Sequence, residues 1–538
     1  MRCRTPVRAS GHSLRGDFST TTGGVAGIVS PVETEHDIGA AESYIASESV
    51  LFEETPPDTS HPPSWNHWRR IEEQLQASCQ PDAFAPLEEP HRQALLDSFA
   101  AHSAPWYPFV TALQIHDAPA LLQRALMLSG SLTRRIDTVE DLRLPYTLYI
   151  QAKESIYASS GRNPIILLMA ITITACWSLR PPSVVSLDGP WHWAGLATRL
   201  ALQLGLHRER TYSHLQSPNE CRLIWYHLMD SDVLQAACWG RPCFIQTSFQ
   251  DVELPPDSDK DSISLRVFKS VTRLLLVLRQ VIEFKLVELP AILAALGDWH
   301  EAVAPSLRLH NAAGHRNQYT KQVNEMFIIY FAIIILVFFR HDMNASHSSP
   351  HQRTSVSPAT IAASSCMTRL YEEIHQHEDS ARLGSIHGFF LMLAAIPQIF
   401  HYTQVSEKDC LRERSLDLIC AVLQNLQVKY GGCNMVLQKI SKLRTEPRDF
   451  NSSQLQPVTM NEEGIPGTVP FPVSGVDQLF PFPTGFAPNL DLLHAWGSQN
   501  TAGQRDMLMD LLSFESSLVD WSGDVGLGVA DFPQQLFM

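Results

Sequence analysis

Hydrophobic residues recur with helical spacing in long stretches from Trp65 onward, and proline-rich or polar breaks separate these stretches. A helix gathers positions i, i+3, i+4 and i+7 on one face, whereas a half-buried strand alternates at every second residue, and no train of alternating strands occurs. The helical stretches are 91–101, 117–136, 163–179, 191–205, 219–238, 262–286, 318–341, 357–377, 384–403 and 408–429. The pattern predicts an all-α fold, a large irregular helical domain without repeats.

One apolar run, from Met326 to Phe339, has the composition of a membrane span. Its 14 residues lie between Glu325 and Arg340. At about 1.5 Å per residue a helix of this length reaches about 21 Å, which is short of a hydrocarbon core of about 30 Å. We therefore expect a helix buried on all sides in the domain, and no membrane partner.

The two ends of the chain differ from its middle in composition and charge. Residues 1–63 hold 4 basic and 9 acidic residues, residues 451–538 hold 1 and 10, and the whole chain of 538 residues carries a net charge of −15. Both ends are rich in Pro, Gly and polar residues, which bury too little apolar surface to fold alone. We predict a disordered lead-in at 1–63, a helical domain at 64–450 and an acidic Pro/Gly-rich tail at 451–538.

The sequence lacks the local signatures of common enzymes and metal sites. It has no phosphate loop, dinucleotide-binding glycine motif, nucleophile elbow or His-Glu-x-x-His helix, and its 10 cysteines form no Cys-x-x-Cys pair. His375 and His377 stand at i and i+2 on a predicted helix, where they point to different faces, so a solvated helix end is expected rather than a metal site. We predict no enzyme, no cofactor in this chain and a reducing compartment, cytosol or nucleus.

The segment from Trp191 to Arg208 predicts a helix with a defined end. Ala194, Ala197, Ala201 and Leu204 form a narrow stripe of mostly small residues, which allows close helix packing. Gly205 stands where a left-handed C-cap is expected, with Leu206 covering the last turn.

The segment from Glu220 to Pro242 predicts a helix with a buried carboxylate. Trp225, Met229, Asp232 and Ala236 share one helical face, so Asp232 lies on an otherwise apolar stripe. A buried carboxylate needs a partner, and Arg241 in the following turn is the candidate. For both segments we favour a scaffolding role over ligand contact.

At these residues the sequence resembles the fungal-specific transcription factor domain, or middle homology region, of fungal zinc-cluster transcription factors. Further on, Phe480-Pro-Phe-Pro483 and Asn489-Leu-Asp-Leu-Leu493 resemble the tail of the subgroup akin to cutinase transcription factor 1-beta. The residues that match the family signature are Trp191, Gly195, Ala197, Arg199, Ala201, Gly205, Leu206, His207, Arg222, Trp225, Asp232, Gly240, Arg241 and Pro242. Three positions depart from the pattern: Tyr226 replaces a Trp, Val233 an Arg and Ala236 a Ser.

The resemblance implies a nuclear transcriptional regulator of a metabolic pathway or a secondary-metabolite gene cluster. The family's DNA-binding unit is a six-cysteine cluster holding two zinc ions, but only Cys3 precedes Cys79 here. Either a zinc-cluster exon is missing, or the regulator works through the transcription machinery or a DNA-binding partner; a homodimer is compatible with the resemblance. The alternatives are a metabolite-sensing or partner-binding helical protein without its own DNA binding, and an enzyme in a helical bundle.

Residues 506–521 combine acidic and large apolar side chains. Leu511, Leu512, Phe514 and Trp521 are the main apolar anchors, and Asp506, Asp510, Glu515 and Asp520 keep them solvated. This composition favours a transcriptional activation segment that folds into a partner's groove. The alternative is a C-terminal helix docked permanently on the domain.

Overall fold

The structure is a computed structural model that describes residues 49–50, 65–78, 87–158, 163–283, 288–346, 357–400, 406–445, 476–490 and 493. Three predictions lie outside these residues: the lead-in apart from Ser49 and Val50, the zinc cluster, and the segment 506–521. Within them the chain is helical, with a single isolated bridge between His310 and Arg316 and no strand. The predicted all-α class is confirmed.

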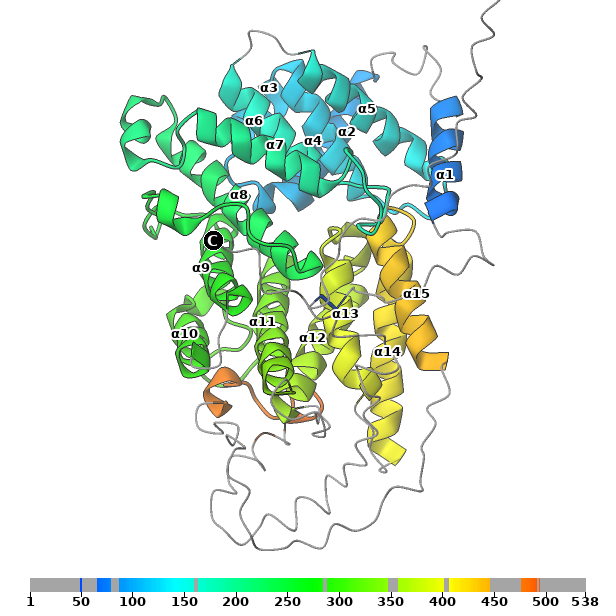
Figure 1. The fold of residues 1–538 in the computed structure, drawn as a ribbon, viewed down its shortest axis with the longest axis vertical. Helices are drawn as coiled ribbons and strands as arrows, with labels where there is room; N and C mark the ends of the chain where they lie inside the picture. The colour runs from blue at the N-terminus through cyan, green and yellow to red at the C-terminus, as the bar shows by residue number, and fades with distance from the viewer. Residues whose placement is uncertain are drawn as a thin grey trace, which may run out of the picture. The chain divides into compact units, whose positions relative to one another are not determined.

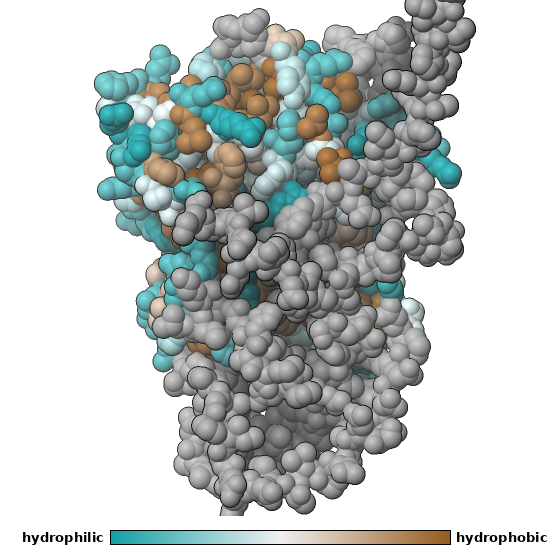
Figure 2. All heavy atoms as spheres, viewed as in Figure 1, coloured by the Kyte–Doolittle hydropathy of each residue, from teal (hydrophilic) through white to brown (hydrophobic). Residues whose placement is uncertain are grey.

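The first group of helices surrounds α4 (Figure 1). It comprises α1 (Trp65–Ser78), α2 (Glu89–Ser98), α3 (Ala112–Asp117), α4 (Ala120–Leu132), α5 (Arg143–Tyr157), α6 (Pro164–Thr174) and α7 (Pro190–Gln203). Helix α4 packs on α2, α5 and α6, and ten of its residues, from Leu121 to Leu132, are buried. Figure 2 shows hydrophobic and hydrophilic side chains interleaved on the visible face of this group.

The second group of helices surrounds α11 and α13. It comprises α9 (Ile263–Ile282), α10 (Leu289–Ala302), α11 (Lys321–Ser346), α12 (Pro358–Gln376), α13 (His387–Phe400), α14 (Ser406–Leu426) and α15 (Gly431–Thr445). Helix α11 packs on α9 and α12, and α13 packs on α12, α14 and α15. Helix α8 (Pro218–Trp239) joins the two groups, because it contacts α6 and α7 on one side and α9 on the other.

Side-chain caps fix where several of these helices begin. The side chain of Asn163 accepts a hydrogen bond from the Ile165 amide, and Ser357 accepts one from Ala359; a proline follows each cap. Ser262 accepts from the Leu265 amide at the start of α9. These bonds satisfy amides that have no partner within the helix, and proline suits the first turn because its missing N–H costs no bond there.

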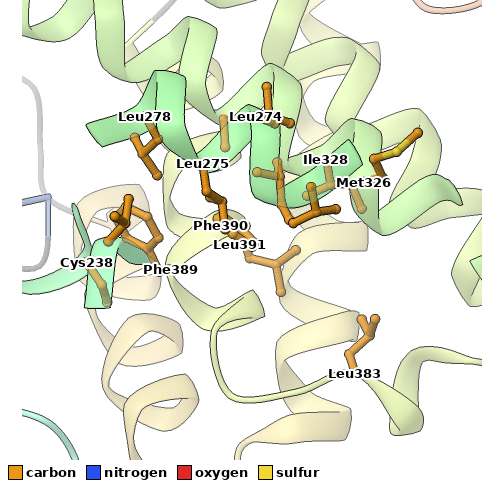
Figure 3. Close-up of a cluster of buried hydrophobic side chains, with 14 of the residues drawn as sticks. Cys238, Leu274, Leu275, Leu278, Met326, Ile328, Leu383, Phe389, Phe390 and Leu391 are labelled. Atoms are coloured by element: carbon orange, nitrogen blue, oxygen red, sulfur yellow. The ribbon is translucent and has the colours of Figure 1, made fainter. Parts of the chain in front are cut away.

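The long apolar helix α11 lies inside the helical block, as predicted. Residues 321–341 are long and apolar enough to span a membrane, but 83% of the most apolar window is buried. Side chains from Met326 to Phe338 are almost all inaccessible, and they pack against α9, α12 and α13. Figure 3 shows Met326 and Ile328 of this helix in a core shared with Leu275 of α9 and Phe390 of α13.

A segment beyond the predicted domain end at 450 also packs on the helices. The Tyr330 hydroxyl donates to the Leu479 carbonyl at 2.8 Å, and the Phe480 ring stacks on Phe331 with centroids 6.1 Å apart. Phe482 meets His300 edge-on at 5.4 Å. Residues 476–490 therefore pack on the helices although they lie beyond residue 450. Their aromatic and apolar side chains explain the difference, because burying them is worth more than the entropy of ordering a short segment.

Candidate functional site

A cavity of about 550 Å³ lies where α8 meets α9, α11 and α13. Its walls are mostly apolar and include the aromatic side chains of Trp106, Tyr107, Phe268 and Phe390. Figure 3 shows part of the wall, with Cys238 at the end of α8, Leu275 of α9 and Phe389 of α13. This volume falls in the range of about 300–1,000 Å³ that small-molecule sites occupy.

Glu325 of α11 is the best-paired carboxylate in the cavity wall. Its oxygens lie 3.2 Å from Lys321 Nζ, 3.2 Å from His387 Nε2 and 3.2 Å from the Trp106 indole nitrogen. Burial acts to raise the pKa of Glu325, but the charge of Lys321 and the bond with His387 outweigh it and leave the pKa lowered. The group is therefore an ionised structural carboxylate with all its charge compensated.

His387 is held in one orientation between Glu325 and Tyr371. The Tyr371 hydroxyl lies 2.9 Å from His387 Nδ1, while Nε2 faces the Glu325 carboxylate. Both ring nitrogens of His387 therefore have hydrogen-bonding partners within the domain. The triad fixes α11, α12 and α13 to one another.

Asp232 is buried as predicted, but its predicted partner is wrong. Its two carboxylate oxygens accept hydrogen bonds from the backbone amides of Phe244 and Ile245 at 2.9 and 2.8 Å. Burial raises its pKa, and the two amides and the nearby charge of Arg279 counteract that rise. Asp232 therefore anchors the chain after α8 by binding main-chain groups, which sequence spacing cannot reveal.

Arg241 instead stacks on aromatic rings. Its guanidinium carbon lies 4.9 Å from the Trp191 ring centroid and 4.8 Å from that of Trp239. All three residues line the cavity. Close by, the Ser49 hydroxyl donates to the Cys238 carbonyl at 2.6 Å, so the N-terminal part of the chain reaches this wall.

Asp230 is a third buried carboxylate, and it lines the cavity two positions before Asp232. The Thr272 hydroxyl of α9 donates to its Oδ2 at 2.7 Å, and no other described residue is hydrogen-bonded to the carboxyl group. Burial, opposed only by that bond, raises the pKa of Asp230 to about 8. On α8, burial lowers the pKa of His227 to about 4, so this cavity-lining imidazole is neutral at pH 7.

The end of α7 has the predicted cap. Gly205 has φ of 74°, its amide donates to the Leu202 carbonyl at 3.0 Å, and the Leu206 amide donates to the Ala201 carbonyl at 3.0 Å. These two bonds and the fully buried Leu206 form a Schellman cap. Gly240 follows the last residue of α8 with φ of 64°, a left-handed conformation that glycine adopts without a steric penalty.

A second group of signature residues fixes the loop after α7 to α8. Arg222 pairs with Glu209, and its guanidinium lies 4.5 Å from the Tyr212 ring centroid. The Trp225 indole donates to Gln250 Oε1 at 3.3 Å, and the His207 ring lies 6.3 Å from Trp225. None of these residues lines the cavity.

The remaining signature residues have scaffold positions. Ala197 and Ala201 are fully buried, whereas Arg199 and Pro242 are exposed, and Arg199 lies 5.8 Å above the Phe244 ring. Gly195 has no atom within 4 Å of where a Cβ would stand. Of the fourteen signature residues, only Trp191 and Arg241 line the cavity.

In the part of the chain that the structure describes, no group of three His, Cys, Asp or Glu side chains could hold a metal ion. His375 and His377 are exposed at the end of α12, as predicted. Sequence reasoning missed Asp230, Glu325 and His387. The only local signal of these three residues is that each is a polar or charged residue at the edge of an apolar helical run, which does not indicate a site.

Residues 96–296 match the sequence family described as the fungal specific transcription factor domain. By this match, the stretch is similar to that domain. It contains α4 to α9 and all fourteen signature residues, so the resemblance carried by those residues is confirmed. It also contributes Asp230, Trp191 and Arg241 to the cavity wall.

The chain is also similar to curated regulators. The acetamidase regulatory protein of Aspergillus fumigatus is 28% identical over 186 residues, which cover 32% of this chain and 24% of that protein. The proteins of the same name from Aspergillus oryzae and Emericella nidulans are 27% and 28% identical, over 35% of this chain and 25% of each relative. The chain thus spans about a quarter of the length of these relatives. No solved structure matches it.

Proposed function

We propose that this chain is a transcriptional regulator that acts in the nucleus and not an enzyme. The observation that carries the proposal is the match of residues 96–296 to the fungal specific transcription factor domain, together with relatives named as regulatory proteins. The proposed layout is a lead-in at 1–63, a regulatory helical domain from 64 to about 450 extended by residues 476–490, and an acidic tail. Its partners would be the transcription machinery or a DNA-binding protein.

The partners of Glu325 support a structural role for this residue rather than a catalytic one. Glu325, the ionised carboxylate of the wall, is fully occupied by Lys321, His387 and Trp106. A general base or nucleophile needs a free reactive atom beside the substrate, and this carboxylate has none to spare. Binding in such a cavity would change the packing of helices instead.

The target genes would belong to a metabolic pathway or a secondary-metabolite cluster. The relatives are named for the regulation of acetamidase, and this supports control of small-molecule metabolism. To bind DNA directly, the protein would require the family's zinc cluster. Before Cys79 this sequence has only Cys3 as a possible zinc ligand.

A reporter assay tests the proposal directly. The full chain, joined to an unrelated DNA-binding domain, should change the expression of a reporter with matching sites by several-fold, and a fluorescent fusion should accumulate in the nucleus. The matched control is the same fusion with residues 451–538 removed, which also removes the packed segment 476–490. A well-expressed full fusion that stays outside the nucleus and leaves the reporter unchanged would contradict the proposal.

The second candidate is a metabolite-sensing helical protein without its own DNA binding. The specific observation in its favour is the cavity of about 550 Å³ at the junction of α8, α9, α11 and α13. Both candidates require the helical domain to respond to something that it binds. They differ in whether the full chain acts on a promoter.

A further inference from the structure

The three buried carboxylates of the described residues differ in how their charge is compensated. Asp232 has two backbone amides with Arg279 nearby, and Glu325 has Lys321 as well as His387. Asp230 has one hydroxyl, that of Thr272, and no charged group is among the causes of its pKa shift. A buried carboxylate normally has a cation or several donors, because desolvating the charge is costly.

Asp230, the one of these three carboxylates without a charged partner or backbone amides, also faces a space large enough for a ligand. Its side chain is more than nine-tenths buried, and the residue lines the cavity of about 550 Å³. Glu325 lines the same cavity, but its carboxylate is already paired with neighbouring side chains. Asp232 is not in the cavity wall. The position without a counter-charge therefore lies where an incoming molecule can supply one.

The rest of the wall suits an organic cation. Trp106, Tyr107, Phe268 and Tyr430 offer aromatic surface, and the rings of Trp191 and Trp239 already bind the guanidinium of Arg241 at under 5 Å. Aromatic faces attract cations and also cover the apolar body of a ligand. The other arginines of the wall are neutralised, Arg180 by Glu72 and Arg382 by Asp379.

We propose that the cavity binds a small aromatic or apolar amine, with its ammonium group on Asp230 and its apolar body against the aromatic wall. This inference deepens the metabolite-sensing role proposed above, but binding is measured on the purified chain and does not depend on any reporter. Thr272 orients the carboxylate through Oδ2 and leaves Oδ1 for the ligand. In the empty cavity the carboxyl group keeps its proton, since burial raises its pKa to about 8.

Two pairs of probes separate the charge from the apolar body. Tryptamine and tryptophol share the indole and the two-carbon arm and differ only in ammonium against hydroxyl; phenethylamine and 2-phenylethanol form a smaller pair. Calorimetric titration of the full chain at pH 7.4 should give at least one amine a Kd at least ten-fold lower than that of its alcohol. Equal affinities within each pair, or no binding of either amine at millimolar concentration, would overturn the proposal.

Two variants locate the site. Asp230→Asn keeps the shape of the side chain but cannot carry a charge. It should therefore remove the ten-fold preference for the amine and leave the Kd of the alcohol within about two-fold of its wild-type value. Asp298→Asn removes an exposed acid from α10 and should keep the preference. An unchanged preference in Asp230→Asn would place the amine elsewhere and contradict the assignment. The wild-type comparison stands without either variant if one of them folds poorly.

Discussion

Asp230 and Asp232 lie two positions apart on α8, and their different partners lead to opposite effects on stability. Asp232 accepts hydrogen bonds from two main-chain amides, so removing its side chain leaves two donors without an acceptor. Asp230 receives one hydroxyl, so its ionised form is costly in the empty cavity. Substitutions at the two positions should therefore change the free energy of unfolding in opposite directions at neutral pH.

Asp232→Ala should destabilise the protein by about 2–4 kcal/mol. It leaves the amides of Phe244 and Ile245 without acceptors, and each buried unsatisfied donor costs about 1–3 kcal/mol. Arg241→Ala removes stacking on two rings and should cost about 0.5–2 kcal/mol. Urea denaturation of both variants and of the double variant measures their coupling, which should be near zero. A coupling energy above about 1 kcal/mol would instead support the predicted ion pair between Asp232 and Arg241.

Asp230→Asn should stabilise the empty protein near pH 8 and flatten its pH dependence. The pKa of Asp230 is about 8 in the folded chain, against an ordinary pKa of 3.8 for an exposed aspartate. The folded state therefore holds a proton that the unfolded state releases. This contribution to stability is complete below about pH 4 and is lost as the pH rises to about 8, by up to about 1.4 kcal/mol per pH unit. Urea midpoints measured from pH 5 to 8 should fall less steeply with pH in the variant than in the wild type. Equal slopes in the two proteins would contradict the raised pKa of Asp230.

At the scale of elements, periodicity located the helices whose ends carry strong signals. The stretches predicted at 191–205 and 219–238 correspond to α7 (Pro190–Gln203) and α8 (Pro218–Trp239). Proline at the first turn and glycine after the last residue mark both, and these residues act through backbone geometry that is independent of the fold.

Helices with weak local signals could not be predicted. Helix α5 has Pro145 near its start, α10 has Pro290 and Gly297, and α15 begins with Gly431 and Gly432. At Gly431 a Cβ would lie 2.4 Å from the Leu179 carbonyl oxygen. These residues disfavour an isolated helix, and tertiary packing overrides that preference.

Two helical glycines should respond in opposite ways to alanine. At Gly130 of α4 a Cβ would lie 2.1 Å from the Leu95 carbonyl oxygen, so Gly130→Ala forces α2 and α4 apart and should cost at least about 1–3 kcal/mol. Gly297 of α10 has no atom within 4 Å of its Cβ position, so Gly297→Ala should stabilise by about 0.5–1 kcal/mol. Denaturant midpoints of the two variants test the packing of α2 on α4. A neutral Gly130→Ala would show that these helices do not approach so closely.

At the scale of the whole molecule, the cavity depends on contacts that sequence patterns do not encode. His387 and Glu325 meet across 62 residues, and Thr272 reaches Asp230 across 42. Each looks like an ordinary polar residue at the edge of an apolar run. The fold class follows from local periodicity, whereas the site follows from how helices distant in sequence cross.

The chain as given should not bind duplex DNA specifically by itself. Residues 64–450 are nearly neutral and both ends are acidic, so phosphate attraction is weak, and a zinc cluster cannot form from Cys3 alone. Electrophoretic mobility shifts with random and promoter-derived duplexes at physiological salt should show no selective complex. Nanomolar, sequence-selective binding would contradict this prediction and would require a DNA-binding surface on the helical domain.

The acidic segment 506–521 should activate transcription when it is separated from the helical domain. Because residues 476–490 pack on α10 and α11, a fusion of residues 494–538 to an unrelated DNA-binding domain leaves the docked part out. This fusion should raise reporter expression several-fold, since apolar anchors among acids suit a partner's groove. Replacing Leu511, Leu512, Phe514 and Trp521 by Ala should abolish the increase, whereas replacing Ser516 and Ser517 by Ala, which removes no anchor, should preserve it. If a nuclear, well-expressed fusion of 494–538 is silent, the segment is better explained as a helix that docks on the domain.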